Sequence, residues 1–150
     1  DGRYCIVSPG SIKDIYEEGV VLKHCIHTCD IYFQRMDIRE TYLLFLRRTD
    51  KPDVPWYTLE IEPGGNIRQK KSVLNEAYKD LDDAMPFLKK WQQWVKKNLS
   101  AKDKKLAEKS DKARKDGYRQ LREEKKLIWH GRLQGTLLAD ALENDFMEVV

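Results

Sequence analysis

The segment Pro63-Gly64-Gly65-Asn66 constrains the fold most, because it separates two short strand-like runs at hairpin spacing. These runs are residues 56–61 and 67–71. Two further strands are predicted earlier, at 3–7 and at 41–47, where short runs rich in aromatic and aliphatic residues occur. Consecutive strands joined in this way predict an antiparallel meander.

Helical patterns surround these strands. Ser11 is a good N-cap for a helix over 12–18, which Gly19 would end. Apolar positions at helical spacing then predict a second helix over 20–35, which carries the step His24-Cys25. Helices packed on a small antiparallel sheet define an α+β fold.

The pattern becomes helical again from about residue 82. One apolar stripe is formed by Ala84, Phe87, Leu88, Trp91, Trp94, Val95 and Leu99. Ser100 can cap a helix over 101–129, whose apolar positions are sparse and which Gly117 can interrupt, and 133–147 predicts a short docking helix. We therefore expect an α+β core domain over 1–99. A basic helical extension with an acidic tail, packed on that core, would follow over 100–150.

The net charge of +3 hides a strong asymmetry along the chain. Residues 89–126 contain fifteen Lys and Arg against six Asp and Glu, whereas residues 139–150 contain four acids. A segment this basic attracts polyanions.

Composition also indicates the cellular compartment in which the protein is expected. No run approaches the roughly 18 apolar residues of a membrane span, so no membrane partner is expected. Three cysteines, Cys5, Cys25 and Cys29, do not make a disulfide framework, which favours a reducing compartment such as the cytoplasm. Because the chain begins at Asp1 and not at Met, we expect it to be a trimmed chain or the C-terminal part of a longer protein.

A series of short motifs resembles one known family. In chain order they are Tyr4-Cys5-Ile6, Ser11, Asp14, Glu18-Gly19, Leu22, His24-Cys25-Ile26, Leu44–Arg47, Pro52-Asp53, Pro55, Tyr57–Ile61, Gln69 and Phe87-Leu88-x-x-Trp91. This series resembles the PcfJ-like family, which is encoded on conjugative plasmids, phages and other mobile elements. The sequence departs from the family pattern at Cys29, where a tyrosine is expected, and at Lys70-Lys71-Ser72, which replaces a basic residue and a glycine. The resemblance implies an α+β domain from a mobile element and supplies no settled activity.

The His-Cys step is one candidate site. In the functional interpretation Cys25 is a nucleophile, His24 or His27 is its base, and Glu60 orients the base. Against this, a cysteine in the middle of a helix lacks the helix N-terminus or the cation that lowers a thiol pKa. In the structural interpretation Cys25 and Cys29 are small core residues. His24 is then a buried anchor that is hydrogen-bonded to Glu60 or to backbone.

Metal binding and anion binding are two other possible roles of this region. A zinc site would need His24, Cys25, His27 and Cys29 together, but one helix cannot turn all four inward, so no metal and no cofactor are expected. Arg47 forms either a structural cross-strand ion pair with Glu60 or an anion-binding site beside His24.

The basic segment is the other candidate site. Its predicted nucleic-acid-binding residues are Lys96, Lys97, Lys102, Lys104, Lys105, Lys109, Lys112, Lys115, Arg119 and Arg122. A charged helix can equally be a solvated face that carries i,i+4 ion pairs, such as Glu108 with Lys112 or Asp111 with Lys115, or it can bind an acidic protein. Trp94 and Tyr118 could stack on bases or belong to the core.

These observations leave three classes of function open. The leading hypothesis is a mobile-element accessory module that binds DNA, RNA or a nucleoprotein complex through its basic helices. The second is a host-directed interaction protein, for example an inhibitor of a defence nuclease. The third is an enzyme that depends on Cys25, His24 and Glu60.

Overall fold

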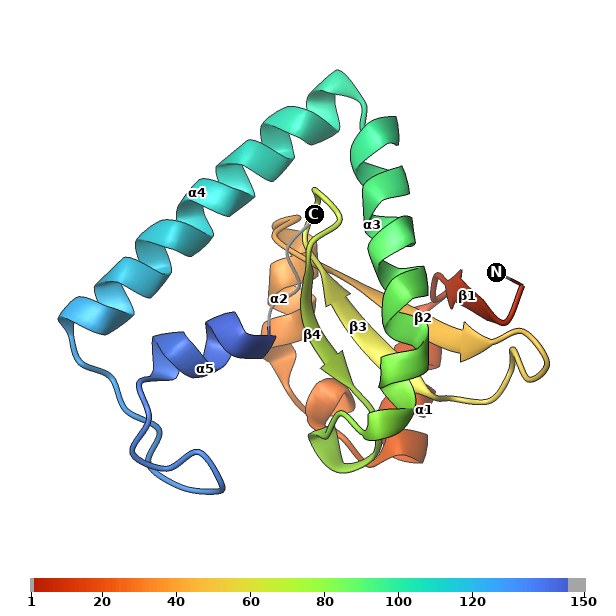
Figure 1. The fold of residues 1–150 in the computed structure, drawn as a ribbon, viewed down its shortest axis with the longest axis horizontal. Coiled ribbons are helices and arrows are strands. Elements are labelled where there is room, and N and C mark those ends of the chain that lie inside the picture. Colours follow the sequence, from red (N-terminus) through yellow and green to blue (C-terminus); the bar gives the residue numbers. More distant parts are fainter. Residues whose placement is uncertain (1, 146–150) are drawn as a thin grey trace.

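The computed structural model describes residues 2–145 and builds them around a four-stranded antiparallel sheet (Figure 1). The strands are neighbours in chain order: β1 (Tyr4–Val7), β2 (Tyr42–Arg48), β3 (Tyr57–Ile61) and β4 (Ile67–Lys71). The predicted meander and the α+β class are confirmed, and each strand boundary lies within one residue of its prediction.

The hairpin between β3 and β4 forms where the glycines predict it. The Glu62 amide donates to the Asn66 carbonyl and the Gly65 amide donates to the Glu62 carbonyl, each over 2.8 Å. Gly65 has a φ of +89°, which disfavours a side chain. A Cβ at Gly65 would also lie 2.8 Å from Val95 Cγ1, so this turn packs closely against a helix.

One face of the sheet is covered by the helices that follow β1. They are α1 (Ile12–Leu22), the short 3₁₀ turn η1 (Cys25–His27) and α2 (Asp30–Asp37). Their core combines Ile15 and Ile26 with Leu43 and Phe45 of β2.

The predicted stop at Gly19 and the predicted single helix over 20–35 are both wrong. Helix α1 continues through Gly19, because this glycine is needed for close packing and not for ending a helix. A Cβ there would lie 2.5 Å from His27 Nδ1 and 2.8 Å from Ile26 Cγ2. The chain leaves the helix at Lys23, which is left-handed with a φ of +50°. His24 then lies in extended backbone.

The other face of the sheet is covered by α3 (Met85–Asn98), which follows the 3₁₀ segments η2 (Val73–Asn75) and η3 (Lys79–Ala84). Leu46, Tyr57, Leu59 and Leu88 form the centre of this second core. The predicted apolar stripe of α3 is correct at Leu88 and wrong at Trp94, which is exposed.

The C-terminal extension is an unbroken helix, α4 (Ala101–Glu123), followed by α5 (Leu138–Asp145). Ser100 caps α4 as predicted, since its hydroxyl accepts from the Asp103 amide over 3.1 Å. The predicted interruption at Gly117 does not occur.

The predicted end of α4 at 129 is also wrong. Lys125 adopts a φ of +50°, and its amide donates to the Arg122 carbonyl, so the chain turns away after Glu123.

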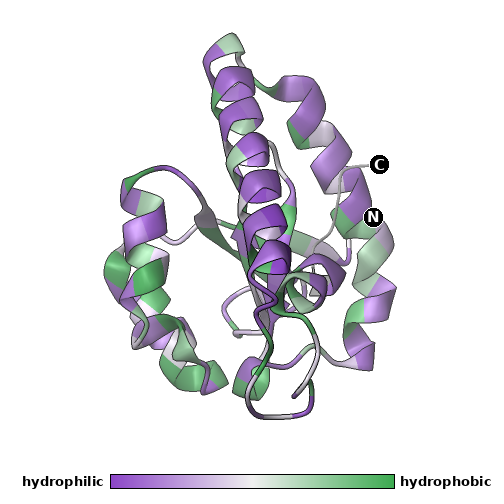
Figure 2. Cartoon of the chain, turned by 90° about the vertical axis from the view of Figure 1, so that its left-hand side faces the viewer, coloured by the Kyte–Doolittle hydropathy of each residue, from purple (hydrophilic) through white to green (hydrophobic). Residues whose placement is uncertain are grey.

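Helix α4 leads away from α3 and the chain returns through α5, which contacts β4 and buries Ala139 (Figures 1 and 2). Figure 2 shows α4 as mostly hydrophilic along its length. The predicted docking segment 133–147 contains α5, and its last two residues lie outside the described residues. No helix within residues 2–145 is long and apolar enough to cross a membrane.

Candidate functional site

A buried ion pair lies between α1 and the sheet. Arg47 on β2 donates to both carboxylate oxygens of Glu18 on α1, and Arg47 Nη1 lies 3.0 Å from Glu18 Oε1. The side chains are only 6% and 2% exposed. Burial raises the pKa of Glu18 above its ordinary value, whereas the hydrogen bond and the charge of Arg47 oppose that change.

Hydrogen bonds through Thr58 on β3 connect this ion pair to His24. Thr58 Oγ1 lies 3.2 Å from Glu18 Oε1 and 2.9 Å from His24 Nε2. An ionised carboxylate only accepts hydrogen bonds, so the single hydroxyl proton of Thr58 goes to Glu18. Thr58 must then accept from His24, which places the imidazole proton on Nε2.

His24 is therefore held neutral in one tautomer. Its Nδ1 is buried and has no hydrogen-bond partner among the described residues. Burial lowers the pKa of His24, which keeps the ring uncharged at neutral pH.

Glu60 belongs to a different cluster, so the predicted Arg47–Glu60 and His24–Glu60 contacts are wrong. Glu60 Oε1 accepts from Arg35 Nη1 and from Thr41 Oγ1, each over 2.9 Å. The register explains the difference, because Glu60 lies opposite Leu43 and not opposite Arg47.

The Glu60 cluster extends toward α4 through Arg68, whose Nη1 lies 3.8 Å from Glu60 Oε1. Arg68 on β4 donates to Glu40 over 2.9 Å and to Glu62 over 2.8 Å. Burial opposes ionisation of Arg68, but these acids raise its pKa above the ordinary value. Glu62 also lies 3.6 Å from Arg114 of α4, whose side chain is 5% exposed. Arg114 is therefore part of the interface that holds the extension.

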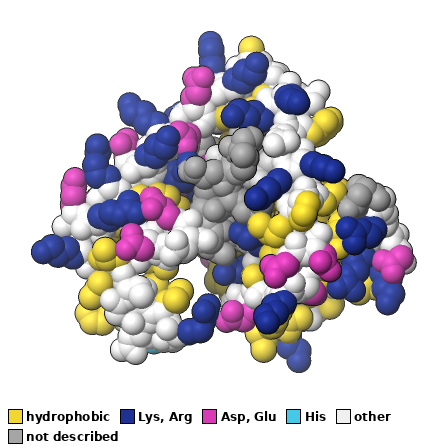
Figure 3. All heavy atoms as spheres, in the orientation of Figure 1, with side chains coloured by type: hydrophobic (Ala, Val, Ile, Leu, Met, Phe, Trp, Pro, Cys, Tyr) yellow, Lys and Arg dark blue, Asp and Glu magenta, His cyan; other side chains and the backbone are white. Residues whose placement is uncertain are grey.

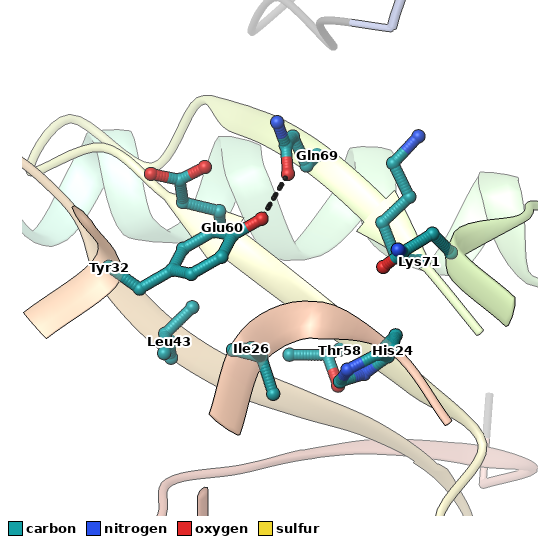
Figure 4. A pocket seen from close by; sticks show the side chains of 9 residues that line it. His24, Ile26, Tyr32, Leu43, Thr58, Glu60, Gln69 and Lys71 are labelled. Atoms are coloured by element: carbon teal, nitrogen blue, oxygen red, sulfur yellow. Dashed lines mark hydrogen bonds between the residues drawn. The ribbon is translucent and has the colours of Figure 1, made fainter. Parts of the chain in front are cut away.

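A small pocket opens beside the first two clusters (Figure 4). Tyr32 Oη donates to Gln69 Oε1 over 3.2 Å. Lys71 follows Gln69 by two residues on β4 and also lines the pocket. The remaining lining residues include His24, Thr58 and Glu60. The space open to water is about 10 Å³, close to what one water molecule needs. This geometry suits a hydrated polar interior better than a substrate site.

The cysteines do not lie on one helix, which corrects the predicted placement. Cys25 begins η1 and Cys29 directly precedes α2. Cys25 Sγ lies 3.8 Å from Asn75 Oδ1. A hydrogen bond with Cys25, together with burial, raises the pKa of the Cys29 thiol. Among the described residues no group of three or more His, Cys, Asp or Glu could hold a metal ion.

The ten predicted nucleic-acid-binding side chains are all exposed. Lys115 is paired with Asp111 over 2.9 Å, Arg119 with Asp116 over 3.1 Å, and Arg122 with Asp140 over 3.2 Å. The predicted Glu108–Lys112 pair does not form. The other seven make no ion pair within residues 2–145: Lys96, Lys97, Lys102, Lys104, Lys105, Lys109 and Lys112. We call these seven residues the lysine face.

Sequence reasoning missed the residues that complete the buried clusters: Glu18, Arg35, Thr58, Glu62, Arg68 and Arg114. The signal available for Thr58 and Glu60 was their alternation along β3, which puts both on the α1–α2 face of the sheet. The partners on helices had no such signal, because the path of the chain between α1 and α2 was predicted wrongly.

Comparison with known proteins gives a family match for the N-terminal part of this chain. No curated protein and no solved structure matches it. A family description, PcfJ-like protein, matches residues 1–85, which span β1 to the start of α3 and contain Glu18, His24, Arg47, Thr58 and Glu60. The chain therefore belongs to the PcfJ-like protein family.

Proposed function

We propose that this chain binds nucleic acid, or a nucleoprotein complex, through the lysine face, as an accessory module of a mobile element. The observation that carries the proposal is the set of seven exposed lysines without acidic partners in the described chain. The free cysteines suit a cytoplasmic setting, because thiols stay reduced there.

Three lysines of the lysine face point away from the rest of the protein, whereas Lys96 lines a pocket between the β3–β4 hairpin and α4. On α4 the buried positions are Ser110 and Arg114, and Lys105, Lys109 and Lys112 lie on the opposite side of the helix. Figure 3 shows Lys and Arg side chains along the outer edge formed by α4, with Asp and Glu side chains between them. A helix of 23 residues is about 34 Å long, enough to follow several phosphates of one strand.

Two acids of the same helix are already paired, whereas the exposed Glu108 offsets part of the charge. Asp111 is occupied by Arg114 and Lys115, and Asp116 is occupied by Arg119. Local pairing of these acids with other cations leaves the lysine face available to an external polyanion.

A charge-removal experiment tests the proposal. Fluorescence anisotropy would measure the binding of labelled single- and double-stranded DNA and RNA at several salt concentrations. Wild type would be compared with the triple variant Lys105→Gln/Lys109→Gln/Lys112→Gln. If three phosphate contacts are lost, the slope of log K against log salt should become shallower by about 2 for a single strand and by about 3 for B-DNA.

The matched control removes the same charge elsewhere. Lys23, Lys51 and Lys79 are exposed on the core domain, and their triple glutamine variant should bind as wild type does. Equal weakening in both variants would show that only net charge matters. No binding by wild type at low salt would refute the proposal.

A second candidate function is the binding of a host protein, for example inhibition of a defence nuclease. Exposed apolar side chains on α1 favour it: Ile12, Tyr16, Val20 and Val21. Surfaces of this kind often mark protein interaction sites. Binding of a partner that is insensitive to salt and is lost in Tyr16→Ala, but not in the lysine triple variant, would favour this function.

A further inference from the structure

Trp94 is an exposed aromatic residue within the basic surface. Its side chain is 62% exposed, although it lies on a helix that buries Leu88 and Gln92. Lys90 and Lys97 are one turn away on either side, so both lie on the same outward side of α3 as Trp94. The indole ring is therefore presented to solvent between two ammonium groups.

A second exposed tryptophan lies beyond the other end of α4. Trp129 is 77% exposed in the loop between α4 and α5. Leu127 bridges Leu137, the Ile128 amide donates to the Thr136 carbonyl over 3.0 Å, and the Gly135 amide donates to the Ile128 carbonyl over 2.9 Å. We call this segment, residues 125–137, the tryptophan hairpin. It presents Trp129 beside two further exposed side chains, His130 and Arg132.

The tryptophan hairpin is attached firmly and carries no acid. Arg122, near the end of α4, pairs with both Asp140 and Glu143 of α5, which ties together the elements on either side of the hairpin. Residues 125–137 contain two lysines and an arginine but no Asp or Glu. A polyanion can therefore approach Trp129 without meeting a like charge from the hairpin itself.

We propose that Trp94 and Trp129 stack on unpaired bases of a single-stranded nucleic acid whose phosphates follow the lysine face between them. This inference rests on the proposed function and deepens it. The ring of tryptophan can stack only on a base face that is exposed, and a duplex hides its base faces. One exposed indole on α3, before the lysine-rich helix α4, and one in the loop after α4 therefore select a single strand over a duplex.

The test uses full-length protein and two single-stranded probes, labelled oligothymidylate and oligouridylate of about 16 nucleotides, which covers the usual range of site sizes. A duplex of equal length is the third probe. Trp94→Ala and Trp129→Ala should each weaken binding to a single strand by about 5- to 140-fold, while duplex binding stays unchanged. The salt slope should also stay unchanged, because neither variant removes a charge. The two single-stranded probes distinguish DNA from RNA.

Control variants separate stacking from general disturbance. Trp94→Phe and Trp129→Phe keep an aromatic ring and should retain most of the affinity. Gln93→Ala and Leu133→Ala change exposed neighbours without a ring and should bind as wild type does.

Two results would contradict the inference, and they differ from failure of the proposed function. If wild type binds but both alanine variants bind single strands equally well, stacking is refuted and electrostatic binding remains. A preference of wild type for the duplex would likewise refute it. If wild type binds none of the probes, the proposed function fails as well.

Discussion

The buried Glu18–Arg47 pair gives a sharp energetic prediction. Both side chains are almost fully buried, so replacing either one leaves its partner charged and without a counter-ion. Breaking such a pair from one side costs about 3–5 kcal/mol. Glu18→Gln and Arg47→Met should each lose that amount of unfolding free energy. For a chain of this length the loss corresponds to a decrease in Tm of about 6–20 °C.

The double variant Glu18→Leu/Arg47→Met is the informative one. Because it removes both charges, it should cost far less than the sum of the single variants. Urea unfolding followed by tryptophan fluorescence and by circular dichroism measures all four proteins. Single variants that lose less than about 1 kcal/mol, or a double variant whose loss equals the sum, would refute the buried pair.

Two other predictions concern packing and pH. Gly19→Ala should destabilise the protein by about 1–3 kcal/mol, because its Cβ would overlap Ile26 and His27, whereas Gly117→Ala has open space and should stabilise it by about 0.5–1 kcal/mol. Thermal unfolding of the two variants checks this contrast, and a Gly19→Ala variant as stable as wild type would contradict it. Since the pKa of His24 is lowered in the folded state, the unfolded chain binds more protons and stability should decrease as pH falls below about 6.5. His24→Gln should show a shallower decrease in urea unfolding between pH 5 and pH 7, and equal slopes would contradict the neutral buried ring.

The strands were predictable because their signals are local. The glycine pair of the hairpin and the short apolar runs determine both the register and the order of the sheet. The α1–α2 region was predicted wrongly because Gly19 has two opposite uses, as a stop signal and as a site of close helix packing. Only the position of Ile26 and His27 in the fold decides between them.

The buried polar site was predictable only in part, because its contacts depend on how distant segments pack. His24 and Glu60 both lie in the polar interior, but their partners come from segments far apart in the chain, and a sequence does not show which distant charges meet. The exposure of Trp94 was hidden because its spacing also fits the apolar stripe of α3. Unpaired lysines could be expected on α4, but the pairing of Arg122 with Asp140 and Glu143 could not, because it depends on where α5 packs.

A nitrogen-15 chemical-shift titration with oligothymidylate and oligouridylate would map the bound strand on the protein. Binding along the lysine face should perturb α3 and α4 between residues 90 and 122 and the indole resonances of Trp94 and Trp129. Perturbations that cluster instead around His24, Tyr32 and Gln69, with α4 unchanged, would contradict it and would place the functional site in the polar pocket.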